Sequence, residues 1–231
     1  LAQAYLEHHA DARSAAARTH LLTPVLGALS PGSSADIWVA ESLAKEVLAP
    51  KAGERDPDWD WRLQTFELIP PAIRDQSKAI LHHWARLLYR SADHRTPRLE
   101  IDQRLERYAS AVDKLERAIS LPRRSGRDEH PSHLYNTLGT AYYYYSIALQ
   151  EADRATDVTA AWASAYAAFE EAIKLSGGVN MESLLAFSRR LLDHAKAAGD
   201  EEPLVQASDV TQALELLAEA DDVAKNYSTP E

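Results

Sequence analysis

The residues best suited to chemistry in this sequence are its histidines, and their spacing limits what they can do. His130 and His133 are three residues apart, with Asp128 and Glu129 just before them. A structural metal site needs three or four converging ligands, so this segment predicts a polar helix start and not a metal centre. Two further pairs are adjacent in the sequence, namely His8 with His9 and His82 with His83. Adjacent residues point in two directions on a helix, so we expect one ring of each pair to be buried and the other exposed.

No other set of residues predicts catalysis. The chain contains no cysteine, which removes thiolate nucleophiles, disulfides and thiolate metal sites. Four carboxylates gather in one Pro- and Gly-containing loop without a matched base, namely Glu54, Asp56, Asp58 and Asp60. Paired catalytic carboxylates need a cleft and shifted pKa values, which this loop does not predict. We therefore expect a protein that is not an enzyme and that carries no cofactor and no metal ion.

The elements that would position any functional residue are helices, because helical periodicity dominates and no segment alternates like a strand. The clearest helix is expected over 99–121, where apolar residues recur at spacings of four and three. Ser33 with Asp36 predicts a capping box that opens a helix through residue 48. Gly177, Gly178 and Gly199 stand where helix C-caps are expected. The other helices are expected over 2–18, 59–68, 71–92, 131–151, 156–175, 180–198 and 203–226.

Three of these helices carry the same small-large-small triplet, and each is preceded by another helix. The triplets are Ala111, Leu115 and Ala118; Ala165, Phe169 and Ala172; and Ala213, Leu217 and Ala220. They lie 54 and then 48 residues apart. Alanine lets a neighbouring backbone approach, and the bulky residue fills the groove between helices. A single helical hairpin cannot bury its apolar face, so the copies are expected to stack.

The middle copy resembles the tetratricopeptide-repeat (TPR) family. Its first helix carries the large-Leu-Gly-large pattern of that family as Tyr135, Leu138, Gly139 and Tyr142, and its second helix carries the triplet around Phe169. The resemblance implies an all-α fold of stacked antiparallel helical hairpins, a TPR-like α-solenoid. The repeat is longer than the usual 34 residues, so the helices are extended. The family's closing proline is present only as Pro122, after the first copy.

The same resemblance suggests how the chain divides. We expect an N-terminal helical unit over 1–69 and a TPR-like repeat domain over 70–231, with hairpins at about 72–121, 131–175 and 180–226. Segment 73–90 also resembles the start of helical arrays in large bacterial STAND-type NTPases and related immunity proteins. In those proteins the array senses a ligand or partner and a separate domain acts. The chain itself has no Gly-rich phosphate loop.

The tyrosine run 142–145 predicts a binding face. Successive helical residues turn by about 100°, which places Leu138, Tyr142 and Tyr145 on one core stripe and turns Tyr143 and Tyr144 elsewhere. In a TPR-like frame, the inner groove is lined by His133, Asn136, Thr140, Tyr143 and Tyr144. Tyrosine suits an interface because it offers a large contact area with few rotors. The alternative is that one or both tyrosines pack on the next hairpin. The Lys/Asn clamp with which the family holds a C-terminal carboxylate is absent at these positions.

A basic stretch offers a second candidate surface, for nucleic acid. It comprises Arg86, Arg90, Arg104, Arg107, Lys114, Arg123 and Arg124. Phosphate binding needs such a patch. However, Glu100 with Arg104 and Asp113 with Arg117 form i,i+4 pairs typical of a solvated helix face. The whole chain is acidic, with a pI of about 5.4, so a protein or peptide partner is favoured over nucleic acid.

Charge and context complete the expectation. Residues 1–69 carry a net charge of −4, residues 70–130 of +4 and residues 131–231 of −10. No apolar run approaches the roughly 20 residues that span a bilayer, and we expect a cytoplasmic protein without a membrane segment. The chain begins at Leu1, so we expect a fragment of a larger bacterial multidomain protein. Its expected role is to bind a protein or peptide; the alternatives are nucleic-acid binding through 86–124 or a structural spacer in a multidomain NTPase.

Overall fold

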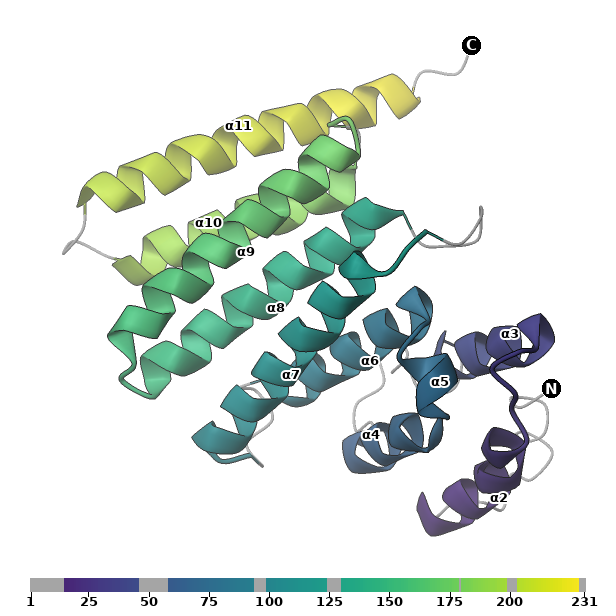
Figure 1. Cartoon of the computed structure of the whole chain (residues 1–231). Coiled ribbons are helices and arrows are strands. Elements are labelled where there is room, and N and C mark those ends of the chain that lie inside the picture. Colours follow the sequence, from purple (N-terminus) through teal and green to yellow (C-terminus); the bar gives the residue numbers. More distant parts are fainter. Residues whose placement is uncertain are drawn as a thin grey trace. The chain divides into compact units, whose positions relative to one another are not determined.

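Helices make up all the regular structure of the described chain. The structure is a computed structural model, and it describes residues 15–45, 58–93, 99–123, 130–178, 180–198 and 203–228. Every regular element in these ranges is a helix, which confirms the predicted all-α class (Figure 1). The chain forms two compact units, residues 1–129 and residues 130–231. Among the described residues, no helix is both long and apolar enough to cross a bilayer.

The first unit is built around one packed helix pair. Its helices are α2 (Ala15–Gly27), α3 (Ser34–Leu43), α4 (Trp59–Leu68), α5 (Pro71–Arg74), α6 (Lys78–Ser91) and α7 (Ile101–Ser120). Helix α6 packs along α7, and α4 packs on both α2 and α6. Phe66 of α4 stacks on Trp84 of α6 with the ring centroids 6.1 Å apart. Because α4 packs on α6, this compact unit extends across the boundary that the sequence predicts between residues 69 and 70.

The start of α3 lies at Ser33, the N-cap residue that the sequence predicts. The Ser33 hydroxyl accepts a hydrogen bond from the Asp36 N–H at 3.2 Å, so the predicted N-cap is confirmed. The Asp36 carboxylate, however, accepts from the Ser30 N–H at 2.9 Å, so the reciprocal bond reaches back one turn further than a capping box. The helix predicted over 2–18 lies outside the described residues up to residue 14, and α2 continues past residue 18 to Gly27.

The single helix predicted over 71–92 is wrong, because the chain forms two helices there. Helix α5 ends at Arg74, and α6 starts at Lys78. Between them the Ser77 hydroxyl accepts a hydrogen bond from the Ile80 N–H at 3.3 Å, which is an N-cap bond. The same hydroxyl donates to Glu41 Oε1 at 2.6 Å. Ser77 therefore caps the start of α6 and links this helix to α3.

The second unit consists of four long helices, α8 (Pro131–Glu151), α9 (Ala155–Leu175), α10 (Met181–Ala198) and α11 (Pro203–Ser228) (Figure 1). Helix α8 pairs with α9 and α10 with α11, while α10 also packs on α8 and α9. The predicted bounds agree within two residues. The predicted cap glycines Gly177 and Gly178 end α9 with φ of 66° and 77°, a conformation that glycine adopts without strain. The predicted cap at Gly199 lies outside the described residues.

The core of the second unit joins three helices through aromatic and aliphatic side chains. Phe169 of α9 stacks on Phe187 of α10 with the centroids 5.1 Å apart. Gly139 of α8 faces the same ring, and a Cβ on Gly139 would lie 2.9 Å from its carbon atoms. The glycine of the TPR-like pattern therefore makes room for Phe169. The buried cluster consists of Phe169, Leu184, Phe187, Leu191, Ala213, Leu216 and Ala220.

The small-large-small triplet is buried in all three helices except at one position. Leu217 of α11 is 36 % exposed, whereas Leu115 and Phe169 are fully buried. Leu216 takes the core position in α11 instead. The core stripe of α11 runs through Ala213, Leu216 and Ala220, at spacings of three and four. Leu217 lies about 100° away from Leu216 around the helix, so the sequence pattern assigned it to the wrong face.

Candidate partner-binding face

The predicted groove residues of α8 divide between its surface and its buried side. His133 is exposed, and Thr140 and Tyr144 are half-buried. These three lie within about 40° of one another around the helix. Thr140 donates its hydroxyl to the Asn136 carbonyl at 3.0 Å. In contrast, Asn136 and Tyr143 are buried, with exposed fractions of 8 % and 7 %. The surface stripe of α8 therefore contains His133, Thr140 and Tyr144.

Tyr143 packs inside the unit, which corrects its predicted place in a groove and agrees with the alternative that one of the tyrosines packs on the next hairpin. Its ring lies edge-on to Trp162 of α9 at 5.7 Å and to Tyr144 at 5.5 Å, measured between centroids. Tyr142 and Tyr145, which were predicted for the core stripe, are only half-buried. The reason is that α8 contacts both α9 and α10. Two neighbours bury two arcs of the helix, and a single core stripe does not describe such an environment.

Arg190 of α10 joins the two tyrosines. Its guanidinium carbon lies 4.7 Å from the Tyr143 ring centroid and 4.9 Å from that of Tyr144, distances at which cation–π attraction acts. The Nη2 group donates to the Tyr144 hydroxyl at 3.2 Å, and Nη1 donates to Asp193 Oδ2 at 3.3 Å. Sequence reasoning missed Arg190. The available signal was its position between Phe187 and Leu191, both of which face the core.

Burial raises the pKa of the inner tyrosine, Tyr143. Burial and the nearby Asp193 carboxylate raise the pKa of Tyr143 from 10.0 to about 12, against the opposing effect of Arg190. The phenol is therefore neutral at physiological pH and stays protonated far into the alkaline range. Tyr143 therefore offers a neutral aromatic ring, against which Tyr144 and Arg190 pack.

A second polar cluster links α9, α10 and α11. The His194 ring of α10 stacks on Trp162 with the centroids 4.0 Å apart, and its Nδ1 lies 2.6 Å from Asp209 Oδ2 of α11. Tyr166 of α9 donates its hydroxyl to the Gln212 side chain of α11. Burial raises the pKa of Tyr166. These contacts cross-link α9, α10 and α11, and they hold the helices that support Arg190.

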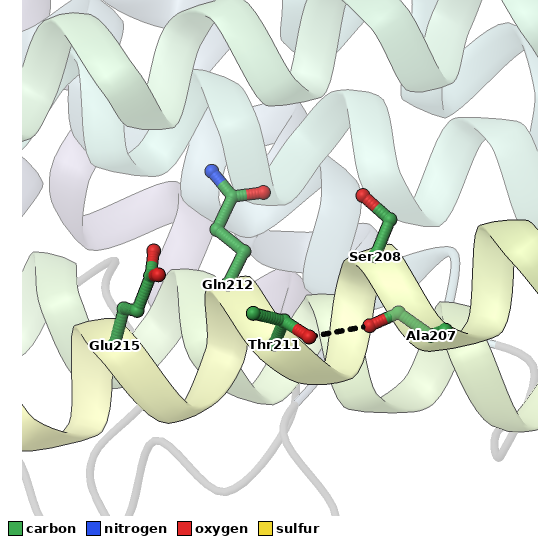
Figure 2. A pocket seen from close by; sticks show the side chains of 5 residues that line it. All are labelled: Ala207, Ser208, Thr211, Gln212 and Glu215. Carbon is green, nitrogen blue, oxygen red and sulfur yellow. Dashed lines mark hydrogen bonds between the residues drawn. The ribbon is translucent and has the colours of Figure 1, made fainter.

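The hollow nearest to this cluster is shallow. It has a volume of about 480 Å³ and is lined by Ala207, Ser208, Thr211, Gln212 and Glu215, all on α11. Figure 2 shows Ser208, Gln212 and Glu215 extending from the same side of that helix. A small-molecule site is normally an apolar cleft in which a few polar groups converge. A hollow lined from one helix by mainly polar side chains does not fit that description.

Three cations of the predicted basic surface contact other groups within the first unit. Arg104 is buried and donates from Nε to the Ala92 carbonyl at 3.2 Å. Arg107 pairs with Asp60 at 3.1 Å. Lys114 lies 5.0 Å from the centroid of the Trp84 ring and pairs with Asp113. Each of these cations therefore has a partner in the protein.

The other residues of that surface have mixed positions. Arg86 and Arg123 are exposed and Arg90 is half-buried, while Arg124 lies outside the described residues. The basic stretch of the sequence is therefore not one continuous exposed patch in the described part of the chain. This weakens the case for phosphate binding, which needs several cations that can reach the backbone of a nucleic acid.

The histidines do not form a metal centre in the described part of the chain, where no group of three or more metal-binding side chains converges. His130 is the N-cap of α8, and its Nδ1 lies 2.8 Å from the Ser132 hydroxyl oxygen. His82 and His83 are both buried with their rings 5.6 Å apart, so the expectation that one ring is exposed is wrong.

The remaining acidic and histidine candidates also lack a common site. Asp58 caps α4 by accepting a hydrogen bond from the Trp61 N–H, and Asp60 pairs with Arg107. The predictions for His8, His9, Glu54 and Asp56 fall outside the described residues.

Comparison with known proteins adds no family: no family model matches the chain, and no curated protein or solved structure matches it.

Proposed function

We propose that this chain is a non-catalytic, TPR-like helical-repeat module that binds a protein or peptide through the face formed by α8 and α10. The observation that carries the proposal is the pairing of Tyr144 with Arg190. Tyrosine and arginine are enriched at the energetic centres of protein interfaces. Here both side chains are held in place by a buried tyrosine and remain partly accessible.

The position of this pair supports a peptide-binding role. Tyr144 continues the surface stripe of α8 that contains His133 and Thr140, so an extended or helical segment has polar contacts along about three turns of the helix. The pair is prearranged by hydrogen bonds and ring contacts, and a prearranged contact loses little conformational entropy on binding. A rigid aromatic–arginine centre beside polar side chains is the arrangement expected of a small protein interface.

Charge indicates the kind of partner. Residues 131–231 contain 6 basic and 16 acidic side chains, a net charge of −10. Asp193, whose side chain is half exposed, pairs with Arg190 at the edge of this face. Complementary charge speeds association and suppresses wrong partners. The segment that binds is therefore basic or neutral.

The proposal is tested by selecting a displayed peptide library on the immobilised chain and measuring the affinity of the enriched peptides. Tyr144→Ala is expected to weaken binding about 30-fold, because truncating a central tyrosine costs about 2 kcal/mol or more. Tyr135→Ala is the matched control, since Tyr135 is a half-buried tyrosine on the opposite side of α8. Equal affinity for both variants, with circular dichroism showing that both fold, would exclude this face as the binding site.

A nucleic-acid partner is a separate outcome of the same set of measurements. Binding of a nucleic acid by the basic stretch would weaken steeply with added salt, because counterions are released on binding. It would also be insensitive to Tyr144→Ala and sensitive to replacement of the exposed Arg86 and Arg123. That combination would favour the alternative function.

A further inference from the structure

Helices α8 and α10 lie side by side along the proposed binding face, and two hydrogen bonds show which of their residues face each other. Asn180 Nδ2, just before α10, donates to the Ser132 hydroxyl of α8 at 3.5 Å, across 48 residues. About three turns further along, Arg190 donates to the Tyr144 hydroxyl at 3.2 Å, across 46 residues. Because this separation stays nearly constant, the two helices run in the same direction, and each turn of α8 lies beside the turn of α10 about 47 residues later.

Two buried polar side chains face each other in this register. Asn136 of α8 lies opposite Ser183 of α10, 47 residues later. Asn136 is 8 % exposed and Ser183 is fully buried. Within the described part of the chain, neither Asn136 Oδ1 nor the Ser183 hydroxyl has a hydrogen-bond partner. A buried polar group without a partner destabilises the folded chain, so such a pair is unusual in the core of a protein.

The buried serines of α8 show that this helix otherwise satisfies its polar groups. Ser132 Oγ lies 2.8 Å from His130 Nδ1, and Ser146 donates its hydroxyl to the Tyr143 carbonyl at 2.7 Å. Both serines are buried. They therefore have partners within the protein, whereas the side-chain oxygen of Asn136 has none among the described residues.

Asn136 adjoins the surface stripe of α8. It lies one turn before the half-buried Thr140 and about 40° from it around the helix. The Thr140 hydroxyl donates to the Asn136 carbonyl at 3.0 Å, which ties the two residues together through the backbone and not through the Asn136 side chain. A segment that lies along the stripe therefore passes next to the Asn136 amide.

We propose that Asn136, with Ser183 behind it, binds a main-chain amide of an extended peptide segment on the α8–α10 face. The inference rests on the proposed function of that face and deepens it by naming the group that is recognised. A side-chain amide carries an acceptor and two donors, so it can pair with both the N–H and the C=O of a peptide group. A helical segment uses these groups in its own hydrogen bonds, so the bound segment is extended at this point.

The environment of Asn136 favours an amide over a charged ligand group. Asn136 and Ser183 are both neutral and buried, so an ion bound there would lose its hydration without gaining an opposite charge. A neutral peptide group loses much less on burial and regains its hydrogen bonds from the asparagine. Since every peptide has such groups, this contact fixes the position of the segment and not its sequence.

The first test replaces single main-chain N–H groups of the bound peptide. The probe is the tightest peptide from the displayed library, synthesised with a fluorophore and as a series in which each residue in turn becomes its α-hydroxy acid. Each member of the series has one ester oxygen in place of an N–H. Fluorescence anisotropy with the whole chain is expected to show one position where the ester weakens binding about tenfold, the effect of one lost hydrogen bond.

Variants assign that position to Asn136. Asn136→Leu and Asn136→Ala are each expected to weaken binding of the unmodified peptide about tenfold and to be insensitive to the ester, because the same hydrogen bond is already lost. Ser146→Ala is the matched control and is expected to change the affinity less than about twofold, since the Ser146 hydroxyl is buried on the same helix but already bonded.

Stability separates a binding role from a structural one. Asn136→Leu removes an unpartnered buried amide, so the midpoint of urea denaturation is expected to stay at the wild-type value or to rise. Ser146→Ala removes a made hydrogen bond and is expected to lower the midpoint. If both Asn136 variants lower the midpoint more than Ser146→Ala does, the amide holds the two helices together and the proposal is rejected.

The binding data give the remaining outcomes. Asn136 variants that bind the peptide as tightly as the wild type would overturn the proposal, as would an ester series without a sensitive position, which is the result expected of a helical segment. Tyr144→Ala distinguishes this failure from failure of the proposed function. If Tyr144→Ala weakens binding and the Asn136 variants do not, only the role of Asn136 is wrong. If the library yields no peptide, or Tyr144→Ala has no effect, the face itself is wrong and the inference falls with it.

Discussion

Helices α9 and α11 carry the same triplet of small and large residues, yet their large residues have opposite environments. Phe169 of α9 is fully buried, between Gly139 of its own hairpin and Phe187 of the next. Leu217 of α11 is 36 % exposed. The alanines of both triplets are buried alike. The alanines are therefore buried in both hairpins, whereas the burial of the large residue depends on whether a further helix packs against it.

The strongest test of this comparison is truncation at the two equivalent positions. Phe169→Ala removes a fully buried aromatic side chain, and we expect it to lower the free energy of unfolding by about 3–5 kcal/mol. Leu217→Ala removes a side chain that is only partly buried, and we expect a smaller loss of about 1 kcal/mol. Urea denaturation followed by circular dichroism measures both values, and hydrogen exchange in α9 peptides assigns the loss to this hairpin. Losses of similar size would mean that the two positions are equally packed.

The first helix of the middle hairpin, α8, also carries an aromatic residue that the next hairpin covers. Tyr143 of α8 is covered by Trp162 of its own hairpin and by Arg190 of the next. Its raised folded-state pKa, about 12 against 10.0 in the unfolded chain, means that its contribution to stability is complete below pH 10 and is lost as pH rises through 12. We expect this loss to reach about 2 kcal/mol between pH 9 and 12.

The matched variant for this titration is Tyr143→Phe, which keeps the ring and removes the ionisable hydroxyl. Urea denaturation of both proteins across this pH range isolates the contribution of Tyr143, because the other groups titrate alike in both. The stability advantage of the wild type over the variant should fall as the pH rises. Parallel curves would show that the phenol ionises as easily in the folded state as in the unfolded state.

The helices themselves could be predicted closely, because their signals are local. The apolar spacing in α7, the proline at the start of α8 and the glycines after α9 each act within a few residues. The break between α5 and α6 was missed although its cause is also local. Ser77 is an ordinary N-cap residue, but it was passed over because the apolar pattern continues across it.

The candidate face could be predicted only in part, because burial depends on helices that are distant in sequence. His133, Thr140 and Tyr144 lie on one side of α8, because the geometry of a single helix determines their relation, while their binding role stays a prediction. For Tyr143 the structure agrees with the alternative of packing on the next hairpin, because Arg190 of α10, 47 residues later, covers its ring. The arrangement of residues around a single helix follows from the sequence. The side from which a neighbouring helix approaches depends on the packing of the whole unit.

The smallest and sharpest effect concerns Gly139, which the middle hairpin places against Phe169. Alanine is favoured over glycine inside a helix by about 1 kcal/mol. A Cβ at this position would nevertheless lie 2.9 Å from the Phe169 ring, whose burial leaves it little room to move. Overpacking typically costs about 1–3 kcal/mol, so Gly139→Ala should lower the free energy of unfolding by about 1 kcal/mol. The sign of the stability change caused by Gly139→Ala should reverse in a Phe169→Leu background. Leucine, which stands at this triplet position in α7 and α11, lacks the ring atoms that a Cβ would meet.

Urea denaturation of the four proteins of this double-mutant cycle measures the coupling directly. If Gly139→Ala stabilises the wild-type protein, or has the same effect in both backgrounds, then the close approach of α8 to α9 does not depend on the pairing of a glycine with a phenylalanine.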